Sequence, residues 1–162
     1  MRRTALAEFE KENGDPDSAG AYVQLSRALL LQGKAAEAGA ALDHAMQFSS
    51  AMSNPALKLP AMIQKERVAT VTSPASSSFA AQQDLKSAIT TARKLGYYNV
   101  EIEGRLALGQ LQLKTNPIAG RALLTILVSE TQGRGLVLVS RHAQEALASS
   151  SNAVADNRRS PR

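Results

Sequence analysis

The stretch from Ala19 to Ser50 constrains the fold of this chain more than any other part of the sequence. Apolar residues recur there at intervals of three and four on both sides of Gly33, which predicts two helices folded back on each other at that glycine. Some positions hold small residues, so the two backbones can approach closely, and larger apolar residues surround that contact. The small residues are Ser26, Ala38 and Ala45, and the large ones are Tyr22, Leu25, Leu29 and Leu42.

This spacing resembles the tetratricopeptide repeat (TPR), a 34-residue helix-turn-helix unit. The resemblance covers residues 19–52, and Ser50 departs from it because the family usually has a proline there. Residues 92–124 are similar to C-terminal TPR segments of larger bacterial regulatory proteins. The eight matching positions are Tyr22, Leu25, Ser26, Leu29, Gly33, Ala38, Leu42 and Ala45. The resemblance implies stacked helical hairpins that bind a partner in a concave groove.

Composition supports a helical fold. Aromatic residues make up only 4% of the chain, tryptophan is absent, and alanine and leucine, which are strong helix formers, are abundant. The 162 residues suffice for one domain with a real core. Cysteine is absent, which excludes a disulfide framework, a thiolate metal site and a cysteine nucleophile.

Outside the first helix pair, apolar spacing predicts further helices separated by Gly-, Pro- and Ser-rich breakers. Ser18, Asn54 and Asn99 are candidate N-caps. The apolar run at residues 136–139 could form a strand, but the helical spacing that continues to Leu147 favours a helix. The predicted helices are residues 4–12, 19–32, 55–71, 79–95, 100–114, 118–130 and 136–147.

We therefore expect an all-α fold: a TPR-like α-solenoid of about three antiparallel helical hairpins plus a C-terminal capping helix. Residues 1–17 are predicted to be a short helix and a breaker, and residues 18–149 the TPR-like repeat domain. Residues 150–162 are predicted to be a disordered basic tail, because they are polar and poor in helix formers.

The net charge of +5 lies mostly at the chain ends. Removing residues 1–3 and 156–162 takes away five arginines and one aspartate, which leaves 14 basic and 13 acidic residues. A nucleic-acid-binding domain usually concentrates basic charge on a folded face. We therefore expect a protein or peptide partner and keep a helical nucleic-acid-binding domain as an alternative.

No catalytic or metal-binding constellation is evident in the sequence. His44 and His142 are the only histidines and are expected to be ordinary surface residues, while Glu101 and Glu103 would diverge on a helix. We expect no enzymatic activity, no metal and no cofactor. The sequence shows neither a signal-peptide pattern nor a long apolar run, so we expect a cytoplasmic protein without a membrane partner.

The TPR resemblance implies which side chains would face the groove. They are Val23, Gln24, Arg27 and Leu30 in the first helix, and Gln64, Arg67, Arg105 and Gln110 in later first helices. One TPR subclass binds C-terminal carboxylates with a Lys and an Asn in its first repeat; Val23 and Arg27 occupy those positions here, so that activity is not expected. The predicted function is a non-catalytic module that binds a peptide or helix. The alternative is the repeat part of a larger signalling or transcription-regulatory protein that needs an effector domain.

Overall fold

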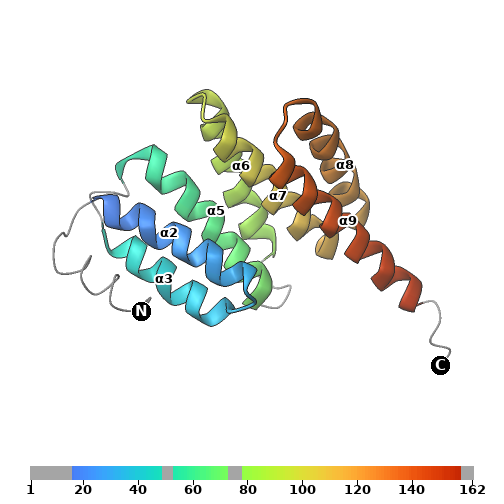
Figure 1. Cartoon of the computed structure of the whole chain (residues 1–162), viewed down its shortest axis with the longest axis horizontal. Helices are drawn as coiled ribbons and strands as arrows, with labels where there is room; N and C mark the ends of the chain where they lie inside the picture. The colour runs from blue at the N-terminus through green and yellow to red at the C-terminus, as the bar shows by residue number, and fades with distance from the viewer. Residues whose placement is uncertain (1–15, 49–52, 73–77, 158–162) are drawn as a thin grey trace. The chain divides into compact units, whose positions relative to one another are not determined.

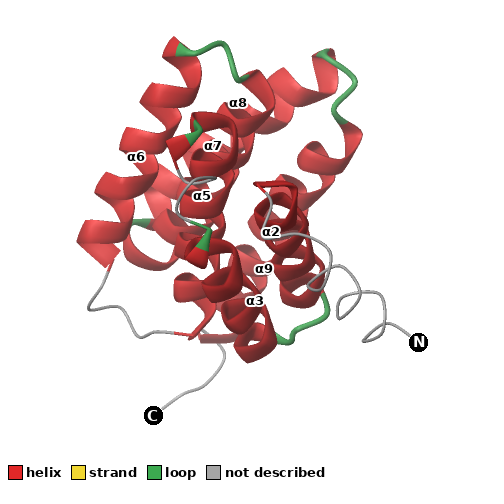
Figure 2. Ribbon diagram, turned by 90° about the vertical axis from the view of Figure 1, so that its left-hand side faces the viewer, coloured by secondary structure: helices red, strands yellow, loops and turns green. Residues whose placement is uncertain are grey.

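The computed structural model describes residues 16–48, 53–72 and 78–157. The regular structure in these ranges is α-helical and contains no strand, which confirms the all-α prediction (Figure 2). The helices are α2 (Pro16–Leu31), α3 (Ala35–Gln47), α5 (Pro55–Thr72), α6 (Ser78–Lys94), α7 (Tyr98–Thr115), α8 (Pro117–Gly133) and α9 (Val137–Asn157) (Figure 1).

The chain divides into two compact units, unit 1 (Met1–Ser73) and unit 2 (Pro74–Arg162). The division falls within the Ser- and Pro-rich stretch after α5, where the sequence predicted the end of a helix. The predicted domain of residues 18–149 therefore includes parts of both units.

Unit 1 is built on the predicted helix pair. Helices α2 and α3 pack against each other, and α5 packs against both. Gly33 ends α2 with a φ of 75°, and the amide of Lys34 donates to the carbonyl oxygen of Leu29 at 3.0 Å, as in a Schellman turn. The small residues predicted at the contact are fully buried; Ser26, Ala38 and Ala45 are each 0% exposed.

Unit 2 is organised around α7, which contacts α6, α8 and α9, while α8 also contacts α9. Buried residues lie on every side of α7, as expected for a helix covered by three neighbours. Gly96 and Gly135 close the α6–α7 and α8–α9 turns with φ values of 73° and 72°. The core cluster of unit 2 consists of Ile102, Leu106, Leu124, Leu127 and Ala143.

Two of the predicted caps differ from the structure. Helix α2 begins at Pro16, which is well suited to the first helical position, so Ser18 lies inside the helix. Helix α7 begins at Tyr98, and Asn99 therefore lies in its first turn. The prediction for Asn54 is confirmed, because its Oδ1 accepts a hydrogen bond from the amide of Ala56 at 3.0 Å.

The ends of the chain differ in part from the expectation. The predicted helix at residues 4–12 lies outside the described residues. Residues 150–157, predicted to be disordered, continue α9 to Asn157. The run at residues 136–139 forms no strand, because residues 137–139 begin α9 and Leu136 immediately precedes it. Extending an existing helix needs no new nucleation, so weak helix formers such as serine and asparagine can prolong α9.

Candidate functional site

The predicted groove residues of α2 do not share one exposed face. Val23 is 3% exposed and belongs to a core cluster with Ala61 of α5, so its assignment to a groove surface is not supported by its position. Arg27 and Leu30 are half-buried, and Gln24 is exposed. The reason is that α5 packs against α2 and covers the side on which Val23 lies.

The exposed positions of α2 differ from the predicted groove positions: Ala28 and Leu31 are exposed in place of Arg27 and Leu30. Its exposed side chains between residues 18 and 31 are Ala21, Gln24, Ala28 and Leu31. Spacings of three, four and three place them on one side of the helix, which we call the open face of α2. This face carries no charge, and Leu31 is 68% exposed.

On α5, Gln64 lies in the core of unit 1 rather than in a groove. It is 1% exposed, and its Nε2 donates to Ser26 Oγ at 3.1 Å. This buried hydrogen bond joins α5 to α2 at one of the small positions of the first helix pair. Arg67, the other groove residue predicted on α5, is half-buried.

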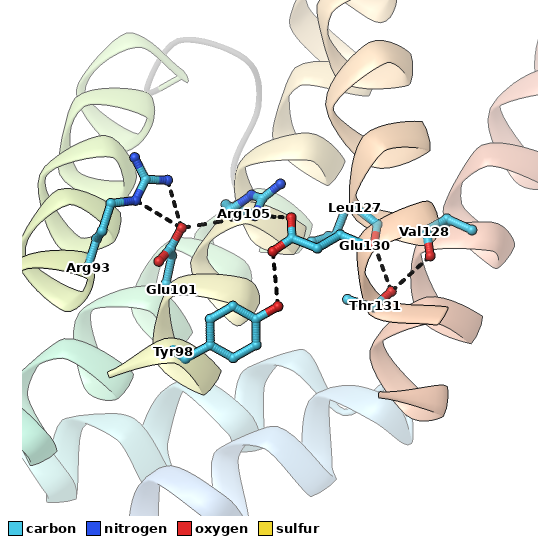
Figure 3. Close-up of polar contacts among 8 residues, drawn as sticks. All are labelled: Arg93, Tyr98, Glu101, Arg105, Leu127, Val128, Glu130 and Thr131. Carbon is cyan, nitrogen blue, oxygen red and sulfur yellow. Dashed lines mark hydrogen bonds and ion pairs between the residues drawn. The ribbon is translucent and has the colours of Figure 1, made fainter. Parts of the chain in front are cut away.

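On α7, Arg105 is held in a charged network instead of facing a groove (Figure 3). Its Nη1 lies 2.7 Å from Glu130 Oε2 on α8 and 3.9 Å from Glu101 Oε1 on α7. Arg93 on α6 donates to the same Glu101 oxygen at 2.6 Å. The Tyr98 hydroxyl donates to Glu130 Oε1 at 2.9 Å, so this charged network joins α6, α7 and α8. Gln110, the last predicted groove residue, is half-buried.

The network sets the charge states of its members. Hydrogen bonding from Arg105 lowers the pKa of Glu130, against the opposing effect of burial, and hydrogen bonding from Tyr98 lowers it further. Burial and the bond to Glu130 raise the pKa of Tyr98. The Arg134 guanidinium lies over the Tyr98 ring, 4.6 Å from its centroid, and adds a cation–π contact. These groups stabilise one another's ionised or neutral forms, so their evident role is to hold three helices together.

The sequence contained only part of the signal for this network. Glu101 and Arg105 are four residues apart, the spacing of an ion pair on a helix. Of the two adjacent tyrosines, Tyr98 packs onto the core cluster of unit 2. The sequence around Glu130 did not indicate its role, because its partners Arg105 and Tyr98 lie 25 and 32 residues away along the chain.

The described residues contain no grouped metal ligands and no membrane-spanning helix. Among them, no three His, Cys, Asp or Glu side chains are grouped so as to hold a metal ion. His44 stacks on the Tyr22 ring with 5.3 Å between the ring centroids. None of the helices in the described ranges combines the length and the apolar character needed to cross a bilayer.

Comparisons with protein-family models, with curated proteins and with solved structures give no match to this chain. The packing defines its class as an all-α protein of two compact helical units. The TPR resemblance of residues 19–52 remains an inference from the sequence.

Proposed function

We propose that this chain is a non-catalytic, TPR-like binding module that holds a peptide or a helix of a protein partner. The observation that carries the proposal is the packing of a third helix against both members of the preceding pair. In unit 1, α5 contacts α2 and α3, and in unit 2, α9 contacts α7 and α8. Arrays of helical repeats grow by this kind of stacking and present extended surfaces to partners.

The turns provide a second line of support. Gly33, Gly96 and Gly135 have nearly the same positive φ, and the amide after each glycine donates to a carbonyl five residues earlier. These bonds measure 3.0, 2.9 and 2.9 Å. One turn geometry used three times is expected of a chain built from similar helix pairs.

The open face of α2 is the surface we assign to the partner. It combines the exposed Leu31 with the amide of Gln24, and the half-buried Arg27 lies at its edge. An apolar contact with a few polar groups beside it suits a peptide or an amphipathic helix. The absence of charged side chains among the exposed residues of this face favours such a partner over a nucleic acid, whose binding depends on phosphate contacts.

The proposal is tested by selecting peptides from a random display library on the full-length chain and measuring their dissociation constants. We expect binders in the micromolar range, about −8 kcal/mol, as for a modest interface. Leu31→Ala should weaken the selected peptide about 5–30-fold, corresponding to about 1–2 kcal/mol.

The matched control is Met46→Ala on α3, since Met46 is also an exposed apolar residue of unit 1. It should leave the affinity unchanged. A selection that yields no binder, or binders that respond to Met46→Ala and not to Leu31→Ala, would refute the proposed binding face.

A further inference from the structure

Helix α8 exposes an unusual set of apolar side chains. Ile118 is 85% exposed and Ile126 is 60% exposed, and the exposed Ala122 lies midway between them. Spacings of four residues place all three on one side of the helix. We call this set the α8 stripe. The stripe belongs to α8 of unit 2, whereas the binding face proposed above belongs to α2 of unit 1.

The exposed side of α8 is also free of charge. The helix has two charged residues, and both are directed to neighbours: Arg121 Nη2 donates to the Ser150 carbonyl at 3.3 Å, and Glu130 belongs to the charged network. Helix α6 of the same unit is different, because its exposed residues include Asp84, Lys86, Arg93 and Lys94. The lack of charge is therefore a property of α8 and not of the whole unit.

The order of residues in the stripe is symmetric about its centre. Reading outward from Ala122 in either direction, the fourth residue is an isoleucine. In an antiparallel pair of α8 helices related by a two-fold axis at Ala122, Ile118 of each copy lies beside Ile126 of the other. The small Ala122 allows the helices to approach at the axis, and the isoleucines fill the space on either side.

We propose that α8 is a self-association surface, on which a second copy of this chain packs its own α8 in antiparallel orientation. The symmetric order of the stripe favours a copy as the occupant, and its lack of charge disfavours a charged partner. A charged partner side chain would lose water on this face without gaining an ion pair, whereas two copies of the stripe bring together no charge at all. A two-fold interface requires a self-complementary patch, and the stripe has that property.

The association is expected to be weak. One helix face per copy is smaller than the roughly 800 Å² that each partner contributes to a standard interface. Dimers should therefore appear at about 10–100 µM chain, not at nanomolar concentrations. Sedimentation equilibrium of the full-length chain across this range measures the dissociation constant directly.

Charge introduced into the stripe should abolish the dimer. Ile118→Glu and Ile126→Glu should each raise the dissociation constant at least tenfold, because each copy then buries a carboxylate against the other. Phe79→Glu on α6 is the matched control, since Phe79 is 74% exposed in the same unit, and it should leave the constant unchanged. A chain that remains monomeric up to about 500 µM, or a dimer that is insensitive to both isoleucine substitutions, overturns the proposal.

Cross-linking tests the two-fold axis itself. The chain contains no cysteine, so each introduced thiol is unique. Ala122→Cys should give a disulfide-linked dimer on mild oxidation. Ile118→Cys and Ile126→Cys should link efficiently only when the two variants are mixed. Ser87→Cys, at an exposed position of α6, is the control for random collision. Equal cross-linking of the control and the Ala122→Cys variant overturns the proposed axis.

Discussion

Gly120 of α8 lies so close to α7 that a β-carbon at its position would stand only 3.0 Å from the carbonyl oxygen of Gly109. The same β-carbon would lie 2.5 Å from the Leu113 nitrogen and 2.8 Å from the Gln112 carbonyl carbon. These are backbone atoms of a helix that three neighbours cover, so they cannot easily move aside. The crossing of α7 and α8 therefore requires glycine at position 120.

Gly120→Ala should consequently destabilise the protein by about 3 kcal/mol, the upper part of the usual range for overpacking. Urea-induced unfolding followed by circular dichroism measures this loss. Gly39→Ala on α3 is the control, because its β-carbon would meet Val68 Cγ1 at an ordinary 3.8 Å. Alanine should stabilise that helix by about 0.5–1 kcal/mol. Equal effects of the two substitutions would show that α7 and α8 are not in close contact.

The buried hydrogen bond between Ser26 and Gln64 gives the second prediction. Ser26→Ala should cost about 1–3 kcal/mol, because the Gln64 amide then loses its bond inside the core. The double substitution Ser26→Ala with Gln64→Leu should recover part of that loss, since an apolar pair needs no hydrogen bond. Unfolding free energies of the wild type and both variants test this. If the Ser26→Ala variant is as stable as the wild type, the hydrogen bond between Gln64 and Ser26 does not form.

The third prediction concerns Arg105, whose side chain is only 13% exposed between two carboxylates. Arg105→Met should destabilise by about 1–3 kcal/mol, since the buried Glu101 and the partly buried Glu130 each lose a charged partner. Arg141→Met removes an exposed ion pair at 3.7 Å and should change stability by less than about 0.5 kcal/mol. Similar losses in both variants, measured by urea unfolding, would argue against a structural network.

The fourth prediction is a pH dependence caused by Glu130. Its pKa in the folded state is below the usual 4.5, so its contribution to stability is fully present above about pH 4.5. That contribution is lost as the pH falls through the folded-state pKa and the carboxylate is protonated. Glu130→Gln removes the titrating group, so this variant should lose less stability than the wild type between about pH 6 and pH 3. Parallel pH profiles of the two proteins would contradict this assignment.

Within the described residues, the sequence was sufficient to predict the seven helices, apart from the extension of α9 beyond residue 149, and several turns. Intervals of three and four identify a helix from local contacts alone, and Gly33 ends α2 as predicted because its φ is positive. The burial of Ser26 and Ala38 also followed from the small-residue pattern. These features depend on residues close together in the chain.

The exposed faces were harder to predict, because they depend on which helices cover a given helix. Val23 was assigned to the groove, yet α5 packs over it. The open face of α2 exposes Ala28 and Leu31 instead of the predicted Arg27 and Leu30. Gln64 and Arg105 were assigned to the groove because they are equivalent, in later first helices, to the groove positions of the TPR pattern. Both are buried or nearly so, with partners on other helices. Periodicity does not specify contacts of this long range.

The most direct test of the proposed binding function is an amide NMR titration of the full-length labelled chain with a display-selected peptide. The chemical shifts of the open face of α2, at Gln24, Ala28 and Leu31, should change most. Those of Asp43 and Met46 on α3 should change little. Saturable shifts confined to α3 or to other helices, with α2 unaffected, would contradict the proposed binding face.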